Sequence, residues 1–171
     1  MKKKIFAGLV VVICFLLQST LFAQFTIGGI RPNLLVIAVA FLGLWDGKRT
    51  GIYAGFFSGL LIDISFGYFY GLNALIYMYI GFFCGFLKKY IYSVDIKMPI
   101  LFIMGCDLGY SLLYYFFAFA LRGNFHFWFY LTHLILPQAV YTTIMACVLY
   151  PLFHIIVKQI EKGDKGEELV G

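Results

Sequence analysis

Apolar residues run along this chain in six long stretches, and polar residues collect in the short segments between them. The stretches cover residues 5–24, 32–45, 50–66, 72–87, 98–121 and 128–157. Each stretch is continuous, whereas membrane-spanning strands would alternate apolar and polar residues. The pattern therefore predicts an all-α integral membrane protein with six transmembrane helices in a compact bundle.

Two of the predicted spans are short, and prolines interrupt the last one. The second and fourth spans would cover only about 20 to 25 Å as helices, less than the roughly 30 Å of the hydrocarbon core. We expect local thinning of the bilayer, or apolar flanks such as residues 25–30, to complete each crossing. In the sixth span, Pro137 and Pro151 are expected to kink or end the helix.

The composition and the charges agree with a membrane location. Of the 171 residues, 63% are hydrophobic and 12% are charged. With the N-terminus inside, every Lys and Arg except Arg31 and Arg122 would face the cytoplasm, where basic residues are retained. We therefore predict cytoplasmic termini, a single transmembrane domain over residues 1–157 and a flexible cytoplasmic tail over residues 158–171. The net charge of +5 is dispersed, which favours contact with the lipid bilayer over nucleic acid.

Glycine recurs at every fourth residue of the third span, at Gly51, Gly55 and Gly59, and Asp63 continues the same ridge. Small residues at this spacing let two helices approach closely in lipid. We expect this ridge to pack against the fourth span of the same chain rather than to form a dimer contact. Since Asp63 lies on the packed face, its carboxylate should point into protein.

Asp63 has two kinds of partner within reach near the outer membrane boundary, about one turn before Gly67. Arg31 begins the second span on the same side. The turn that ends at Gly71 leads into the N-terminus of the fourth span, whose N–H groups attract anions. We predict that Asp63 fastens the outer ends of the second, third and fourth spans by a charge-assisted hydrogen bond.

Asp107 is a second acid inside a predicted span, near the membrane centre, where a carboxylate is costly. A tyrosine, Ser111, Asn73 or His133 could satisfy it, and the sequence leaves these partners open. A proton or cation relay that uses both acids is the functional alternative to packing.

Aromatic residues gather in residues 122–133, after the fifth span, as expected at the headgroup level. They would anchor the chain at the interface or, alternatively, dock a partner on the outer face. Histidines, cysteines and carboxylates do not cluster at metal-ligand spacing, and neither a nucleophile–base set nor a phosphate-binding glycine loop is evident. We therefore expect no catalytic activity, no metal and no cofactor.

Two motifs resemble a known family. RPNLL at residues 31–35 and GFFSGLLIDISFGYFYGLNAL at residues 55–75 are similar to those of the rod shape-determining protein MreD family. The candidates for structural or partner-contact roles are the polar and glycine residues of these motifs together with the acid of the fifth span: Arg31, Pro32, Asn33, Gly55, Gly59, Asp63, Gly67, Gly71 and Asp107.

The resemblance implies a non-catalytic scaffold of the bacterial inner membrane. Such proteins act with the periplasm-facing partner MreC and the actin-like MreB to position the peptidoglycan synthases of the lateral wall. The alternative is the substrate-binding subunit of an energy-coupling-factor vitamin transporter, which is similarly small and six-spanning and similar in overall design. The first span, with Ala7 and Val11 at the relevant spacing, lacks the paired small residues expected where such a subunit meets its coupling protein.

Overall fold

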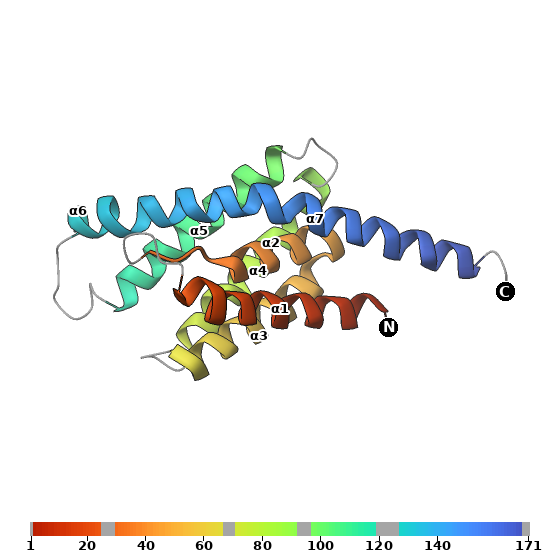
Figure 1. Cartoon of the computed structure of the whole chain (residues 1–171), viewed down its shortest axis with the longest axis horizontal. Coiled ribbons are helices and arrows are strands. Elements are labelled where there is room, and N and C mark those ends of the chain that lie inside the picture. The colour runs from red at the N-terminus through yellow and green to blue at the C-terminus, as the bar shows by residue number, and fades with distance from the viewer. Residues whose placement is uncertain (1, 25–29, 67–70, 92–96, 119–126, 169–171) are drawn as a thin grey trace.

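The computed structural model describes residues 2–24, 30–66, 71–91, 97–118 and 127–168. Its elements are α1 (Lys2–Gln24), α2 (Leu34–Asp46), α3 (Lys48–Phe66), α4 (Leu72–Ile91), α5 (Lys97–Ala118), α6 (Phe127–Tyr130), the π-helical segment η2 (Leu131–Ile135) and α7 (Leu136–Glu168). The last three follow one another without a break, so each of the six predicted spans coincides with a helical segment. The start of α1 and the end of α7 lie toward the same end of the molecule (Figure 1).

Three of these segments are long and apolar enough to cross a membrane on their own. They are Lys3–Thr20 in α1, Lys97–Phe117 in α5 and Trp128–Gln159 in the α6–α7 segment. Helix α2 is apolar but has only 13 residues. The helices that would span a bilayer by length and composition therefore account for half of the predicted spans, and the remaining three segments pack against them.

Helix α2 forms the centre of the bundle. Every residue from Leu34 to Trp45 is buried, and the helix contacts α1, α3, α4, α5 and α7. In Figure 1 it lies between α1 and α7. Because protein surrounds α2, its length does not have to match the thickness of the lipid. The bilayer thinning that we expected for this short span is therefore not required.

A single residue, Gly47, joins α2 to α3. Its φ of 102° lies in a region that L side chains rarely adopt, and its N–H donates to the carbonyl oxygen of Gly43 at 2.9 Å. The Thr50 hydroxyl donates to the Asp46 carboxylate across the same turn at 2.5 Å. The two helices thus form a tight hairpin that brings the α3 ridge beside the core.

Helices α3 and α4 pack backbone against backbone along the glycine ridge. A β-carbon at Gly51 would lie 2.2 Å from the carbonyl oxygen of Gly81, and one at Gly59 would lie 2.3 Å from the Cα of Ala74. A β-carbon at Gly55 would lie 2.2 Å from the carbonyl oxygen of Tyr77. No side chain fits at these distances. The predicted packing of the ridge within the chain is confirmed.

The two prolines of the last segment have different surroundings. Pro137 follows the π-helical turn η2; a proline cannot donate a backbone hydrogen bond, and a wider turn before it is one way to accommodate that loss. Pro151 lies inside α7, which continues to Glu168, so Pro151 does not end the helix. We expected residues 158–171 to form a flexible tail, but α7 includes residues 158–168. Lysine, glutamine and glutamate in this stretch favour a helix.

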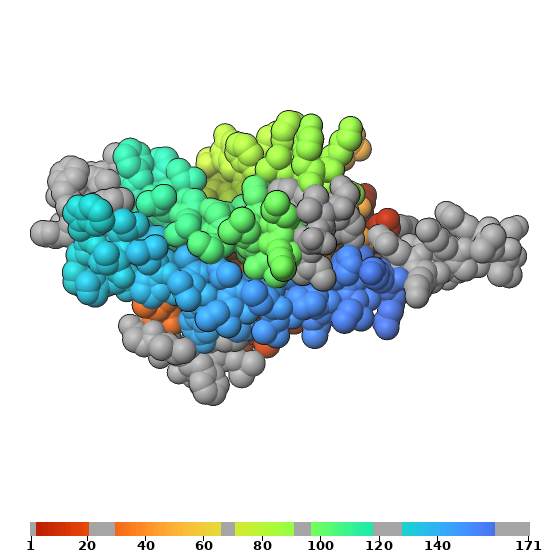
Figure 2. Space-filling view, turned by 90° about the horizontal axis from the view of Figure 1, so that it is seen from above, coloured from red at the N-terminus to blue at the C-terminus, as the bar shows by residue number. Residues whose placement is uncertain are grey.

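Helices α5 and α7 run side by side across one face of the molecule (Figure 2). Large apolar side chains on these two helices are exposed, among them Leu101, Val148 and Ile155. Contiguous apolar surface on a soluble protein would promote association, whereas on helices of this length it suits contact with lipid.

Candidate functional site

Asp63 holds the first turn of α4. Its carboxylate is 1% exposed and accepts hydrogen bonds from the backbone N–H groups of Gly71 at 3.0 Å, Asn73 at 3.3 Å and Ala74 at 3.0 Å. The side-chain amide of Asn73 donates a fourth bond at 2.8 Å. N–H groups at a helix start have no partner within the helix, and the helix dipole favours a negative charge there. Asp63 therefore fastens α3 directly to α4.

The backbone conformation of Gly71 allows its N–H group to bond to Asp63. Gly71 has a φ of 96°, and a β-carbon built on it would meet no atom within 4 Å. The residue is therefore a glycine for its backbone conformation and not for lack of space. Gly67, the preceding glycine of the motif, lies outside the described residues.

Asn73 extends the contact from α4 to α5. Its side-chain oxygen accepts a hydrogen bond from the Tyr110 hydroxyl at 2.9 Å, and the ring of Tyr110 lies 5.0 Å from that of Tyr77. Tyr77 is fully buried, and its hydroxyl donates to Asn33 Oδ1 at 2.6 Å. A run of polar side chains thus crosses the interior from α3 to the start of α2.

Asn33 caps α2 and joins it to α7. Its side-chain oxygen accepts from the N–H of Val36 at 3.3 Å, and its own N–H donates to the hydroxyl of Thr142 at 3.1 Å. The Gln18 side chain of α1 accepts from the N–H of Leu35 at 3.2 Å. Buried backbone donors outside regular helix need such partners, because lipid and protein interior offer no water.

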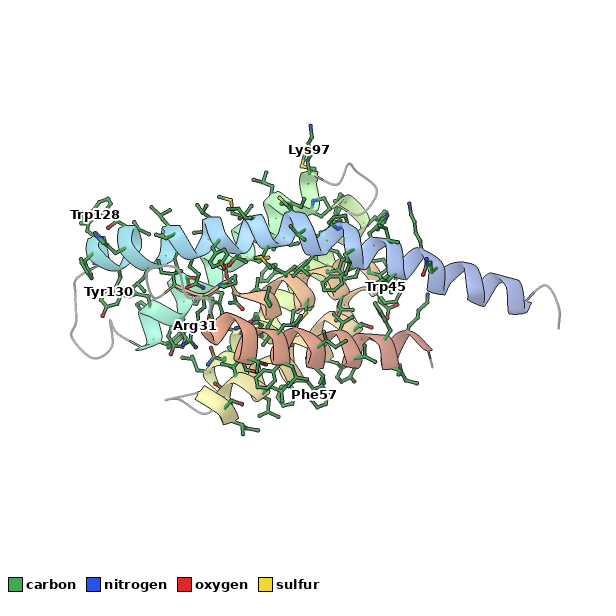
Figure 3. All side chains as sticks on the ribbon, in the orientation of Figure 1. Arg31, Trp45, Phe57, Lys97, Trp128 and Tyr130 are labelled. Atoms are coloured by element: carbon green, nitrogen blue, oxygen red, sulfur yellow. The ribbon has the colours of Figure 1, made fainter. Side chains whose placement is uncertain are left out.

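Arg31 and Pro32 precede this cap. Pro32 is buried and has no N–H, so the buried segment has one donor fewer to satisfy. Arg31 is exposed and lies at the same end of the molecule as Trp128 and Tyr130 (Figure 3). Of the two partners considered for Asp63, the helix start is used; within the described ranges Arg31 forms no ion pair with the carboxylate.

Asp107 is completely buried, and neither of its carboxylate oxygens has a hydrogen-bond partner among the residues that the structure describes. The side chains of Thr142, Gln138 and Asn33 lie close enough to interact with it. The first two belong to α7, so Asp107 faces the α5–α7 contact near the cap of α2. Burying a carboxylate inside an apolar span is costly, and these three polar side chains are the groups nearest to offset that cost.

Two of the partners that the sequence suggested for Asp107, Asn73 and His133, have other surroundings. Asn73 bonds to Asp63, and His133 Nδ1 lies 2.9 Å from the hydroxyl of Thr132. The buried hydroxyl of Ser111 has no partner of its own in the described part of the chain.

A family model for the rod shape-determining protein MreD matches residues 2–160. The chain belongs to the MreD family. The resemblance drawn from the two motifs is confirmed, and membership supports a role in rod shape determination. No curated protein and no solved structure matches this chain.

In this MreD-family chain, the motif residues lie in two places. Asp63, Gly71, Gly55 and Gly59 belong to the α3–α4 contact, whereas Asn33 lies at the junction of α2, α4 and α7. Within the described ranges no group of three or more His, Cys, Asp or Glu side chains could hold a metal ion.

Sequence reasoning missed five polar side chains of this interior: Gln18, Tyr77, Tyr110, Gln138 and Thr142. They lie in four different helices and share no motif, although Gln138 and Thr142 are four residues apart on α7. The signal that would have found them is polarity inside an apolar span, because such side chains turn toward protein and seek a partner.

Proposed function

We propose that this chain is a non-catalytic membrane scaffold of the bacterial cell-elongation complex. It binds MreC and, with MreB, helps to position the synthases that build the lateral wall. Family membership over residues 2–160 carries the proposal. The close packing of α3 against α4, which depends on the Asp63 carboxylate and the glycines, supports it. A tightly packed bundle is suited to holding partner proteins in a fixed position.

The surface that we assign to MreC is a groove between α1 and α3, with a volume of about 840 Å³. On α1 it is lined by Ala7, Gly8 and Val11, and a β-carbon added at Gly8 would meet nothing within 4 Å. On α3 it is lined by Tyr53 and Phe57, which are 65% and 57% exposed. The small residues Ala7 and Gly8, facing the large ones of α3, let a partner helix approach closely in lipid.

Charged residues lie at one end of this groove. Lys4, Asp46 and Arg49 belong to its lining: Lys4 lies in the first turn of α1, Asp46 ends α2, and Arg49 lies in the first turn of α3. Charged side chains are tolerated where a helix leaves the hydrocarbon. They would contact the residues that flank a transmembrane helix of MreC on the cytoplasmic side.

Gly8→Trp tests the groove because a β-carbon at Gly8 would meet no atom within 4 Å and the indole would occupy the groove. We expect about tenfold or more loss of MreC that co-purifies with the chain in mild detergent, since a helix-in-groove contact depends on close approach. Val148→Trp, on the exposed face of α7, is the matched control and should retain MreC. Retention of MreC by a folded Gly8→Trp chain would rule out the groove as the MreC site.

Cell shape tests the function itself. Depletion of the chain should give rounded cells, and expression of the Val148→Trp variant, but not of Gly8→Trp, should restore rods. Normal rods after depletion would contradict the proposed function, whatever the site of MreC binding.

One observation favours the alternative of a vitamin-binding subunit. A second hollow, of about 530 Å³, is lined by tyrosine, glutamine and asparagine side chains and is large enough for a small molecule. Mass spectrometry of the purified chain decides between the alternatives, because a stoichiometric vitamin would favour the transporter subunit.

A further inference from the structure

Two hollows adjoin at the end of the molecule that holds Arg31. The first is the polar cavity of about 530 Å³, to which α1, α4, α5 and the start of α2 contribute Gln18, Asn33, Tyr77 and Tyr110. The second is a groove of about 440 Å³ along α7. Ile30 lines both of them, so they are neighbours.

The groove is apolar and lies on an exposed face. Val140 and Ile144 line it, and each is 57% exposed. Leu136 and Pro137 complete it where η2 passes into α7. A groove of this kind, on a helix long enough to span the membrane, suits a hydrocarbon chain.

Arg31 supplies a positive charge at the rim of the polar cavity. It lines the cavity, is exposed, and forms no ion pair within the described part of the chain. Trp128, at the same end of the molecule, is 75% exposed (Figure 3), as expected for an aromatic side chain at the headgroup level. A guanidinium matches the geometry and charge of a phosphate.

The interior of the cavity has the opposite character. Asn33 and Gln138 line it, and the buried carboxylate of Asp107 lies close enough to interact with both. The rings of Tyr77 and Tyr110 form part of the same wall. Tyrosine faces attract cations, and a buried carboxylate without a hydrogen bond is stabilised by a positive partner.

We propose that these hollows together bind one aminophospholipid. The phosphate of a phosphoethanolamine headgroup pairs with Arg31, and the ammonium lies inside the polar cavity against the wall formed by the two tyrosines, on the side of Asp107. One acyl chain follows the groove of α7. The order of the site from groove to rim to interior matches the order of hydrocarbon, phosphate and ammonium in such a lipid. The assignment does not depend on the binding of MreC.

The test measures which lipid stays with the purified full-length chain. The chain is incorporated into nanodiscs that contain equal amounts of phosphatidylethanolamine, phosphatidylglycerol and phosphatidylcholine, released into mild detergent and weighed by native mass spectrometry. We expect phosphatidylethanolamine to be retained about tenfold over phosphatidylglycerol, which lacks the ammonium. Phosphatidylcholine should be retained less than phosphatidylethanolamine, because its quaternary ammonium cannot donate a hydrogen bond.

Two variants separate the two ends of the headgroup. Arg31→Gln should lower the retention of all three lipids, whereas Asp107→Asn should abolish the preference for phosphatidylethanolamine and keep lipid bound. Lys97→Gln, which removes an exposed positive charge at the start of α5 away from the cavity, should behave as the wild type. Thermal unfolding in the same detergent checks that each variant is folded. The comparison of the three lipids on the wild-type chain tests the proposal even if a variant fails to fold.

Three results would overturn the assignment. They are equal retention of the three lipids by the wild-type chain, an unchanged preference in folded Asp107→Asn, and a co-purified vitamin in place of lipid. None of these results bears on MreC binding at the groove between α1 and α3, so the two proposals fail separately.

Discussion

Glycines recur at the same four-residue spacing in α3 and in α5, but their surroundings are opposite. A β-carbon at Gly55 or Gly59 would lie 2.2 or 2.3 Å from the backbone of α4. A β-carbon at Gly105 or Gly109 would meet nothing within 4 Å. The spacing alone therefore does not show whether a glycine is needed for close approach, because that depends on what faces it.

The two regions are held together by different means. Helices α3 and α4 meet through their backbones, and Asp63 closes the contact at one end. Helix α5 meets the segment from α6 to α7 through large side chains, such as the rings of Tyr115 in α5 and Tyr130 in α6, whose centroids lie 5.3 Å apart. We infer that substitutions that add atoms are tolerated poorly in the first region and well at the glycines of the second.

Gly59→Leu should have the largest effect. The added side chain would begin 2.3 Å from the Cα of Ala74, so α4 would have to move away. We expect a loss of about 3 kcal/mol or more in unfolding free energy, seen as aggregation or a much lower melting temperature in detergent. Gly109→Leu is the matched control on α5 and should stay folded. A Gly59→Leu chain as stable as the control would contradict the backbone contact.

Asp63→Ala should come next. It removes four hydrogen bonds and leaves N–H groups at the buried start of α4 without an acceptor. We expect a loss of about 2 to 4 kcal/mol, and a smaller loss for Asp63→Asn, which keeps one acceptor oxygen. Melting temperatures in detergent measure both. Unchanged stability in both variants would count against a fastening role for Asp63.

Gly71→Ala should cost about 1 kcal/mol. Space is available there, but its φ of 96° is unfavourable for a residue with a β-carbon. The same thermal measurement applies, with Gly8→Ala as the control, since Gly8 lies inside α1 and a β-carbon there meets no atom within 4 Å. Equal melting temperatures for the two variants would show that strain at Gly71 is not significant.

Gly105→Ala should have the smallest effect and the opposite sign. Alanine is more favourable than glycine inside a helix, and nothing at Gly105 resists the added methyl group. We expect a gain of up to about 1 kcal/mol, measured as a slightly higher melting temperature. A clear loss would mean that another surface faces Gly105 in the folded protein.

Much of the fold was predictable from the sequence. The six helical segments follow from continuous apolar stretches, and the α3–α4 contact follows from glycines that recur on one face. The contact between Asp63 and the start of α4 was also predictable, because the two lie only eight residues apart at Gly71. The central place of α2 was not predicted: a short apolar helix has the same sequence pattern whether lipid or protein surrounds it.

The sequence by itself determined which segments are helical and which face of α3 is closely packed, since both depend on residues within a few turns of each other. Only the tertiary structure decided which polar groups meet. Asn33 and Thr142 are 109 residues apart, yet they share a hydrogen bond, and Asp107 lies near side chains of α7 that no spacing relates to it. Contacts of this kind depend on how the helices cross, and the order of apolar and polar residues along one helix does not specify its neighbours.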